Sequence, residues 1–369
     1  NITGDATTQG RLTIWRMALK GWQERPVLGW GQESFTHIFS KHYHPSLWRN
    51  ETWFDRAHNV FLDWLTATGV LGLGAYLAIF GGALVLLVRS FRRGNIDLYI
   101  FSGLSALLFA HFFQNMFVFD SVTSYILFFS VLAWAHQASF AEALPEPKPE
   151  QSVPARISAS GAVIAGISVL LVGYSLVVFN AKPIRAARSI INILIIGAQA
   201  DSRGKVDALI SESKRGIALN TFGTTEIREQ ASITGNNILS DPGIHPQDKQ
   251  KYLAFIIEEM EKQRREKPSD VRAIIFLAPA YQEAGRHQEA IDLINEALKI
   301  SPLRQQFYFV AAEFYFAANQ GDKALALLER AYEIDPRYEA AVYNLAYVLI
   351  LSGRVKEGED ILEKYRGER

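Results

Sequence analysis

The feature that most restricts the fold of this chain is an uncharged apolar run of 21 residues, Thr68–Val88. A helix of this length rises about 30 Å, which is the thickness of the hydrocarbon core of a bilayer. Three further apolar segments follow, at about Asp97–Phe117, Val122–Gln137 and Ser160–Phe179. Each one alone is also compatible with a buried helix of a soluble protein. Four in series predict an all-α polytopic membrane protein.

The orientation follows from the basic residues directly after the first apolar segment, Arg89, Arg92 and Arg93. Basic residues concentrate in short cytoplasmic loops, so this loop is expected in the cytoplasm and residues 1–67 outside it. Successive crossings then make the Pro-rich linker 139–159 cytoplasmic and the chain after residue 180 extracytoplasmic. Three basic residues just after the fourth segment favour the opposite side for that part: Lys182, Arg185 and Arg188.

The two halves of the chain differ sharply in charge. Residues 1–180 carry 12 Lys and Arg and 11 Asp and Glu, whereas residues 181–369 carry 26 and 27. The second half therefore has the composition of a solvated helical domain. The net charge of zero gives no support for nucleic-acid binding, which needs a basic field. There is no cysteine, which excludes disulfides and thiolate metal sites.

The C-terminal third repeats with a period of 34 residues. The positions that recur are Ala278, Ala312 and Ala346; Tyr281 and Tyr315; Ala290 and Ala324; Ala297 and Ala331; Pro302 and Pro336. Small residues at fixed phases let paired helices approach, which indicates a tetratricopeptide α-solenoid over residues 271–369. The last copy departs, with Leu349 in the tyrosine phase and Gly358 in an alanine phase. Residues 181–270 are expected to be helical and repeat-like, without a definable register; a generic helical bundle is the alternative.

The segment Gly10–Trp22 combines an amphipathic pattern with arginines. Four apolar residues recur at helical spacing and form a face of the kind that lies in a membrane interface: Leu12, Trp15, Leu19 and Trp22. Arg11 lies at the edge of this face, and Arg16 points elsewhere. A guanidinium there can form a planar fork onto a phosphate or diphosphate. The alternative is an arginine that reaches a lipid headgroup.

Histidines are concentrated before the first apolar run, at His37, His42, His44 and His58. If a helix begins near Asp55 or Ala57, then His58 lies in its first turn, where the helix dipole favours a neutral imidazole able to accept a proton. A capping or packing role is the alternative. No zinc-ligand spacing accompanies these histidines, so no metal site is predicted.

Two further groups have two interpretations each. The aromatic residues of the same loop can stack on sugar rings or pack the loop onto the bilayer: Tyr43, Trp48, Trp53 and Phe54. The polar trio His111, Gln114 and Asn115 is unfavourable in lipid, so we expect it to face a cavity or neighbouring helices. A purely structural interhelical hydrogen bond is as compatible with this trio as a role in a site.

Four motifs together resemble the O-antigen ligase/polymerase family: G-R-x-x-x-W at Gly10–Trp15, P-V-L-G-W-G at Pro26–Gly31, A-H-N-x-F-L at Ala57–Leu62 and G-V-L-G at Gly69–Gly72. The sequence H-F-F-Q-N at His111–Asn115 is also similar to the closing helices of that family. The resemblance covers roughly Gln9–Ala138, the C-terminal part of the family's membrane domain, so a fragment of a longer chain is expected. It implies a GT-C-like, metal-independent and cofactor-independent glycosyltransferase. Members with C-terminal tetratricopeptide repeats are common.

The resemblance also implies roles for individual residues. The family's loop arginine maps onto Arg11, which would stabilise charge on the diphosphate leaving group of a polyprenyl-diphosphate-linked glycan. Its histidine maps onto His58, which would take the proton of the attacking hydroxyl, with inversion at C1. The further residues predicted to bind substrate are Arg16, Arg49, Trp15 and Asn59. The acceptor is left open between a lipid, a sugar and a protein.

The predicted organisation has six parts. They are an extracytoplasmic catalytic loop (1–67), three membrane helices (68–138), a Pro-rich linker (139–159), a fourth membrane helix (160–180), a degenerate helical region (181–270) and tetratricopeptide repeats (271–369). The chain is expected in the cell membrane, with a protein partner on the repeats and no nucleic acid. The alternatives are a non-enzymatic membrane-anchored repeat scaffold and a protein O-oligosaccharyltransferase of the same superfamily. A transporter has little support, because the spans carry no charge at mid-depth.

Overall fold

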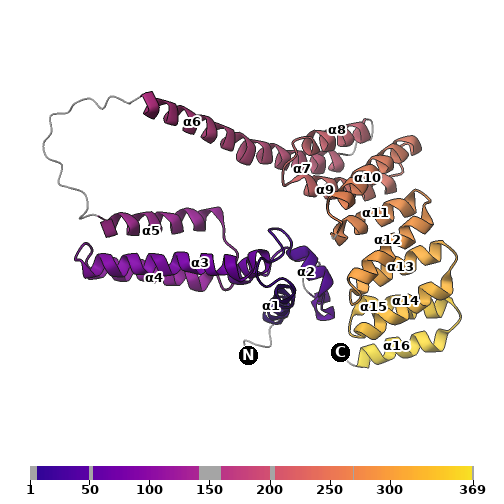
Figure 1. The fold of residues 1–369 in the computed structure, drawn as a ribbon. Helices are drawn as coiled ribbons and strands as arrows, with labels where there is room; N and C mark the ends of the chain where they lie inside the picture. The colour runs from indigo at the N-terminus through magenta and orange to yellow at the C-terminus, as the bar shows by residue number, and fades with distance from the viewer. Residues whose placement is uncertain (1–5, 50–52, 141–158, 200–203, 269, 368–369) are drawn as a thin grey trace. The chain divides into compact units, whose positions relative to one another are not determined.

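The computed structural model describes residues 6–49, 53–140, 159–199, 204–268 and 270–367. All regular secondary structure in these ranges is helical (Figure 1). The chain divides into two compact units, Asn1–Val153 and Pro154–Arg369. The all-α prediction is therefore confirmed for the described part of the chain.

The first unit holds a small helical subdomain followed by a three-helix bundle. Its helices are α1 (Ala6–Glu24), α2 (Phe35–Lys41), the 3-10 helix η1 (Pro45–Arg49), α3 (Val60–Arg92), α4 (Leu98–Gln114) and α5 (Val122–Phe140). Helix α3 packs against both α4 and α5. Phe80 of α3, Leu108 of α4 and Phe128 of α5 are buried in the core of this bundle.

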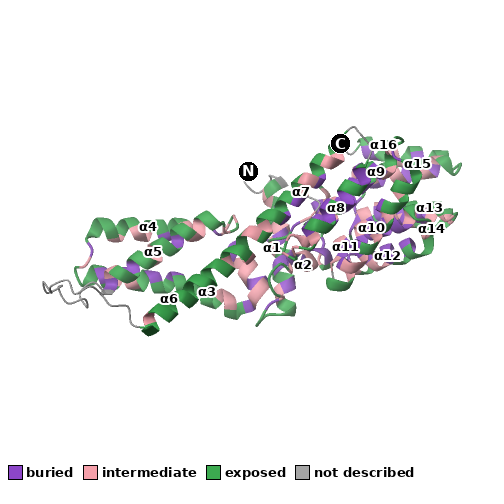
Figure 2. Cartoon of the chain, turned by 90° about the horizontal axis from the view of Figure 1, so that it is seen from above, coloured by how far each residue is buried: buried purple, intermediate pink, exposed green. Residues whose placement is uncertain are grey.

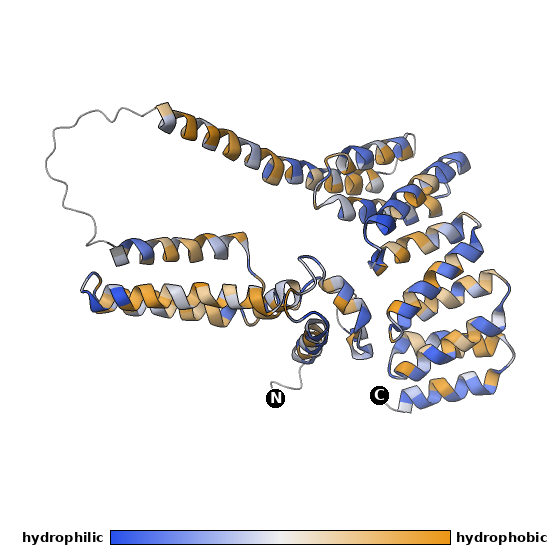
Figure 3. Cartoon of the chain, viewed as in Figure 1, coloured by the Kyte–Doolittle hydropathy of each residue, from blue (hydrophilic) through white to orange (hydrophobic). Residues whose placement is uncertain are grey.

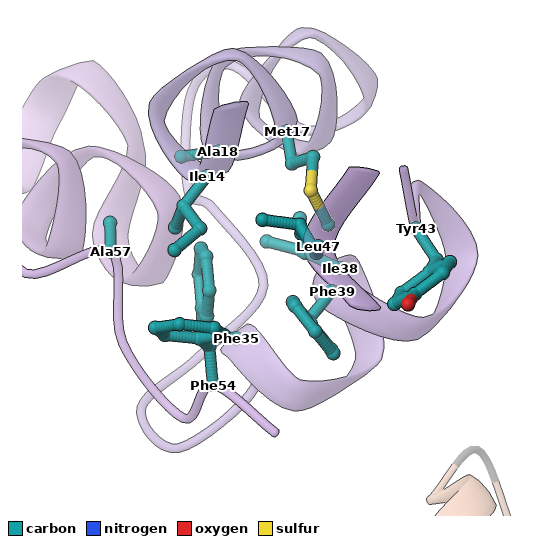
Figure 4. Close-up of a cluster of buried hydrophobic side chains, with 10 residues drawn as sticks. All are labelled: Ile14, Met17, Ala18, Phe35, Ile38, Phe39, Tyr43, Leu47, Phe54 and Ala57. Atoms are coloured by element: carbon teal, nitrogen blue, oxygen red, sulfur yellow. The ribbon is translucent and has the colours of Figure 1, made fainter. Parts of the chain in front are cut away.

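The subdomain before α3 has a hydrophobic core of its own, shown in Figure 4. Ile14, Met17 and Ala18 recur at helical spacing on α1 and pack against α2 and the segment around Phe54. Aromatic side chains close this core, with the rings of Phe39 and Phe54 5.6 Å apart. The predicted catalytic loop is thus a packed unit that can hold side chains in fixed positions. The Leu12–Trp22 face predicted for the membrane interface lies beside this core, outside the buried stripe of α1.

Helix α3 is interrupted at Gly69, whose backbone is at φ 66° and ψ −164°. The interruption frees the carbonyls of Thr66 and Ala67, which accept hydrogen bonds from the N–H groups of Trp30 and Gly31 at 2.8 Å each. The Val70 N–H donates to the Pro26 carbonyl at 2.9 Å. A Cβ on Gly69 would lie 2.2 Å from the carbonyl oxygen of Val27. Two of the predicted glycine motifs therefore meet, backbone to backbone, at this break.

Two of the described helices are long and apolar enough to cross a membrane, Val60–Arg92 and Ala159–Ala198. They contain the first and the fourth predicted segments. The second and third segments form the shorter helices α4 and α5, of 17 and 19 residues. Length and composition thus support two of the four predicted spans. Hydrophobic residues gather on α3 to α5 and on α6 (Figure 3).

The second unit begins with α6 (Ala159–Leu176), which continues through a π-helical turn, η3 (Val177–Ala181), into α7 (Lys182–Ala198). No residue of α6 is buried (Figure 2), and Leu170 and Leu171 are 74% and 62% exposed. A helix that is apolar all round and uncovered by protein has the surface of a lipid-embedded segment. The predicted boundary at residue 180 falls inside this continuous helix.

The rest of the second unit is a series of helix pairs. Its helices are α8 (Lys205–Ile217), α9 (Thr224–Ser240), α10 (Pro246–Glu266), α11 (Val271–Glu283), α12 (His287–Ile300), α13 (Gln305–Ala317), α14 (Gly321–Ile334), α15 (Glu339–Leu351) and α16 (Val355–Gly367). Successive helices pack on each other from α7 to α16. A buried ion pair ties α9 to α10: the guanidinium of Arg228, 5% exposed, lies 3.1 Å from the Glu259 carboxylate and 2.6 Å from that of Glu266.

The repeat phases correspond to tight helix contacts. The alanines of all three phases are buried: Ala278, Ala290, Ala297, Ala312, Ala324, Ala331 and Ala346. In the last pair Leu349 fills the tyrosine position and is buried. Gly358 stands in an alanine phase because a Cβ there would lie 2.7 Å from Ile350 Cγ1 and 2.8 Å from the Ala346 carbonyl oxygen. The departures of the last copy thus have a steric reason.

Candidate active site

Trp15 attaches α1 to the residues that precede α3. Its indole Nε1 donates a hydrogen bond to the Ala57 carbonyl at 3.1 Å. Its ring centroid lies 6.3 Å from that of Phe117, in the connection between α4 and α5. Trp15 was predicted to bind substrate. In the structure its indole instead joins α1 to the residue before His58 and to the α4–α5 connection.

Arg11 lies one helical turn before Trp15 and is exposed. Its Nη1 donates to the Phe117 carbonyl at 3.3 Å. A guanidinium has five N–H groups in a planar fork, so a single contact of this kind leaves most of its donors for an anion. The contact keeps the Arg11 side chain against the α4–α5 connection.

His58 lies outside α3, which begins at Val60 with Asn59 as its N-cap. The prediction that His58 occupies the first helical turn is therefore wrong, and the dipole argument for its neutral form no longer applies. The His58 backbone is at φ 54°. This left-handed conformation is uncommon for residues other than glycine, and its strain is held in place by the surrounding fold.

Asn59 fixes the position of His58. Its Oδ1 accepts hydrogen bonds from the N–H groups of Phe61 at 3.0 Å and Leu62 at 3.1 Å, and the residue is buried. These N–H groups belong to the first turn of the helix and have no carbonyl partner within it, so an N-cap side chain normally accepts from them. Asn59, predicted to bind substrate, thus has a capping role in this structure. On the other side of His58, the Ala57 N–H donates to the Asp63 carboxylate at 2.7 Å.

The imidazole of His58 lies between two aromatic rings. Its centroid is 5.7 Å from that of Phe54 and 5.7 Å from that of Phe119. Within the described part of the chain, neither ring nitrogen makes a hydrogen bond. Both nitrogens are therefore available to a bound group.

Arg11 and His58 approach the same short segment, residues 117–119. Arg11 contacts the carbonyl of Phe117, and His58 packs on the ring of Phe119. The structure therefore places a guanidinium and an imidazole at the two ends of three consecutive residues, on one compact unit.

The other two predicted arginines lie elsewhere. Arg16 is exposed on α1, and Arg49 is exposed at the end of η1, with its guanidinium carbon 4.7 Å from the centroid of Trp48. Among the described residues, no hydrogen bond or ring contact joins either arginine to segment 117–119.

Three charged residues that the sequence did not single out gather beside this segment. The guanidinium carbon of Arg56 lies 5.8 Å from the centroid of Phe119. Arg56, Asp63 and Asp120 line a cavity of about 260 Å³. Arg56 immediately precedes the A-H-N motif and Asp120 immediately follows Phe119, but their convergence depends on contacts between distant parts of the chain.

Two members of the polar trio lie together in the structure, with the Asn115 amide nitrogen 3.3 Å from His111 Nε2. The Asn115 amide donates to the Tyr76 hydroxyl at 2.8 Å, and its backbone carbonyl accepts from the Val60 N–H at 2.9 Å. The His111 ring stacks on Phe80 at 5.9 Å, and Gln114 is exposed. Both residues line a cavity of about 330 Å³, as expected of polar groups in this position. Asn115 therefore makes the structural interhelical hydrogen bond that was one of the two interpretations.

Two of the histidines before α3 have local partners. His42 Nε2 lies 2.9 Å from the Glu24 carboxylate, and His44 Nδ1 lies 2.8 Å from the Ser46 hydroxyl. Burial lowers the pKa of His42, against the opposing effect of the Glu24 carboxylate. Within the described ranges, no three His, Asp or Glu side chains are grouped as metal ligands.

The comparisons with known proteins bear on both ends of the chain. Residues 2–77 match the family model of the O-Antigen ligase, and residues 281–330 and 315–369 match a tetratricopeptide-repeat model. The predicted resemblance is confirmed for these segments. The ligase match contains Arg11, Trp15, His58 and Asn59. No curated protein matches the sequence.

Solved structures with similar helices cover about half of the chain. MamA from Desulfovibrio magneticus RS-1 is 12% identical, with 48% of this chain and 94% of that chain covered and a TM-score of 0.34. A thermophilic tetratricopeptide protein of Thermus thermophilus is 18% identical, with 48% and 89% covered and a TM-score of 0.33. At these scores neither likeness bears on function.

Proposed function

We propose that this chain is part of a membrane glycosyltransferase of the O-antigen ligase type. Its donor is a glycan linked to polyprenyl diphosphate, which it transfers or polymerises on the outer face of the cytoplasmic membrane. The observation that carries the proposal is the convergence of Arg11 and His58 on residues 117–119, within a unit whose residues 2–77 match the ligase family. The acceptor is a lipid, a sugar or a protein.

The reaction is a single displacement at C1 of the donor sugar. An acceptor hydroxyl attacks C1, and its proton passes to a ring nitrogen of His58. The bond between C1 and the diphosphate oxygen breaks, and polyprenyl diphosphate leaves with the electron pair. Because attack and departure occur on opposite faces, the configuration at C1 inverts. A positioned base contributes on the order of 10²–10⁴-fold to such a step.

Arg11 has the complementary role at the leaving group. Charge accumulates on the diphosphate as the C1–O bond breaks, and a guanidinium aimed at that oxygen stabilises it. The carbonyl of Phe117 holds the Arg11 side chain at 3.3 Å, which limits the reorganisation needed during the reaction. Arg16 and Arg49, both exposed, are second donors to the diphosphate or the lipid headgroup layer in this scheme. Neither a metal ion nor a cofactor is required.

The membrane placement is part of the proposal. The uncovered apolar surfaces of α3 and α6 are the segments that lipid would cover, and α4 and α5 complete a multi-pass bundle. Residues 1–67 and the repeats lie outside the cytoplasm, as the basic loop Arg89–Arg93 favours. The repeats present a surface for a protein partner.

The test is glycan transfer by Arg11→Ala and His58→Ala. Membranes that contain each variant are given a labelled polyprenyl-diphosphate glycan, and transferred glycan and released polyprenyl diphosphate are both measured. Each variant is expected to lose at least about 100-fold in rate, because a transition-state donor or a general base is removed. Lys20→Ala, an exposed cation on the same helix as Arg11, is the matched control for charge. Near-normal transfer by both variants would refute the proposal.

A non-enzymatic membrane-anchored scaffold is the second candidate, favoured by the tetratricopeptide match at residues 281–369. The same assay separates the two candidates, because only an enzyme releases polyprenyl diphosphate. The scaffold gives no reason for the strained His58 backbone or for its unoccupied imidazole nitrogens.

A further inference from the structure

We propose that the cavity lined by Arg56, Asp63 and Asp120 binds a sugar ring of the acceptor through its hydroxyl groups. The inference rests on the proposed function and specifies one substrate subsite of it. The cavity is about 260 Å³, slightly below the roughly 300–1,000 Å³ usual for small-molecule sites, which suits one ring rather than a glycan chain. It is lined by Gln32, Arg56, Val60, Asp63, Trp64, Asp120 and Tyr125.

Asp120 is the residue that points to a ligand. Its side chain is only 5% exposed. Oδ2 accepts a hydrogen bond from the Tyr76 hydroxyl at 3.4 Å, and the Tyr125 hydroxyl also interacts with this carboxylate. Oδ1 is buried and makes no hydrogen bond of normal geometry among the described residues. His111 Nε2 lies 4.0 Å from Oδ1, beyond hydrogen-bond distance. A buried carboxylate oxygen without a donor is unfavourable, so a bound hydroxyl at this position would satisfy it.

Phe119 connects the cavity lining to the imidazole that would take the proton, although His58 does not itself line the cavity. Phe119 joins the two: its ring contacts His58 at 5.7 Å, and the next residue along the chain is Asp120. Arg56 lies 5.8 Å from the centroid of the same ring and lines the cavity. In this proposal, a hydroxyl of the ring held by Asp120 reaches His58 past the ring of Phe119.

The charges of the lining select the ligand class. Two carboxylates, Asp63 and Asp120, repel a phosphate, so the donor diphosphate belongs on the Arg11 side of segment 117–119. An isolated cation is disfavoured by the guanidinium of Arg56 in the same lining. A neutral ring with several hydroxyls is compatible with the carboxylates and with the guanidinium. Each hydroxyl can donate to a carboxylate and accept from the guanidinium or the Gln32 amide. The indole of Trp64 supplies an apolar wall for the face of the ring.

The kinetic test uses Asp120→Asn in the membrane assay, with donor and acceptor varied separately. The KM for the acceptor is expected to rise at least about tenfold, because a charged acceptor of hydrogen bonds is replaced by a neutral one. The KM for the donor should stay within about twofold. Asp55→Asn, an exposed carboxylate nearby that does not line this cavity, is the matched control. An unchanged acceptor KM, or a change confined to the donor KM, overturns the inference.

A binding experiment keeps the inference separate from the enzymatic proposal. The detergent-solubilised chain is titrated with the methyl glycosides of glucose, galactose, mannose and N-acetylglucosamine, and contacts are followed by saturation-transfer NMR. Saturable transfer from at least one of them, lost in Asp120→Asn and resistant to inorganic phosphate, supports the subsite even if no glycan transfer is found. No saturable binding, or binding unaffected by the substitution, overturns it.

A second variant tests the inference in case Asp120→Asn fails to fold. Arg56→Gln removes the guanidinium from an exposed side of the cavity and leaves the buried Asp120 network intact. If Asp120→Asn does not insert or fold, the same loss of sugar binding is expected from Arg56→Gln. Unaltered binding in a folded Arg56→Gln variant would then refute the inference.

Discussion

Replacement of Gly69 by alanine should release the Pro26–Gly31 segment from helix α3. Gly69 occupies a backbone region that is essentially restricted to glycine, with φ 66° and ψ −164°. An alanine there would be strained by about 1–3 kcal/mol. Its Cβ would also lie 2.2 Å from the Val27 carbonyl oxygen, a contact that backbone atoms cannot relieve without moving apart.

The size of the effect follows from the backbone hydrogen bonds that are lost when the Pro26–Gly31 segment moves away from α3. Three backbone hydrogen bonds join the segment to α3, from Trp30, from Gly31 and to Pro26. Each contributes about 1 kcal/mol net. Strain together with the loss of these bonds gives about 4–6 kcal/mol as an upper limit, since the break can partly relax. We expect the free energy of local opening to fall by at least about 3 kcal/mol, which is more than 100-fold in an equilibrium constant.

Amide hydrogen exchange measures this opening directly. The amides of Trp30 and Gly31 should exchange more than 100-fold faster in Gly69→Ala than in the unaltered chain. Gly74→Ala is the control, because it lies in the same helix and its Cβ would meet no atom within 4 Å. It should leave these rates within about threefold and favour the helix by about 0.5–1 kcal/mol. If Gly69→Ala leaves the protection of both amides unchanged, the proposed role of the break is wrong.

Three further substitutions test the packing described above, each by the midpoint of chemical unfolding or by local exchange. Asn59→Ala should destabilise the first turn of its helix by about 1 kcal/mol, seen as faster exchange of its first amides, because the N-cap is lost. Arg228→Ala should lower the stability of the second unit by about 1–3 kcal/mol, because the buried Glu259 carboxylate loses the guanidinium and keeps only Lys262 of its described ionic partners, at 2.7 Å; an unchanged midpoint would contradict this. Gly358→Ala should destabilise by about 1–3 kcal/mol through overlap with Ile350, whereas a stabilised variant would show that the last helix pair can separate freely.

The repeats could be predicted because their information is local and periodic. Each 34-residue unit places small residues where its own two helices touch. The burial of Ala278, Ala312 and Ala346 can therefore be predicted without knowledge of the rest of the fold. The departures of the last copy are also visible in the sequence, but the sequence alone does not explain them. The glycine in place of alanine at position 358 depends on the bulk of Ile350 across the helix pair.

The start of α3 was predicted incorrectly although its signal is present. Asn59 is a preferred N-cap residue directly before an apolar run, and that pattern places the first helical residue at Val60 and His58 outside the helix. The break at Gly69 and the cavity at Asp120 had no such signal. Both depend on segments brought together by the fold, the glycine on Pro26–Gly31 and the aspartate on Tyr76.

The uninterrupted run from α6 through η3 to α7 has a mechanical consequence. If α6 crosses the bilayer as proposed, no break in the helix separates the lipid-embedded part from α7, the first helix of the packed series α7 to α16. Tilting or rotating α6 would turn the packed series α7 to α16 with it, and bending would concentrate at the wider π-helical turn Val177–Ala181. A force applied by a partner to the repeats would then reach the membrane-spanning helix through continuously packed helices.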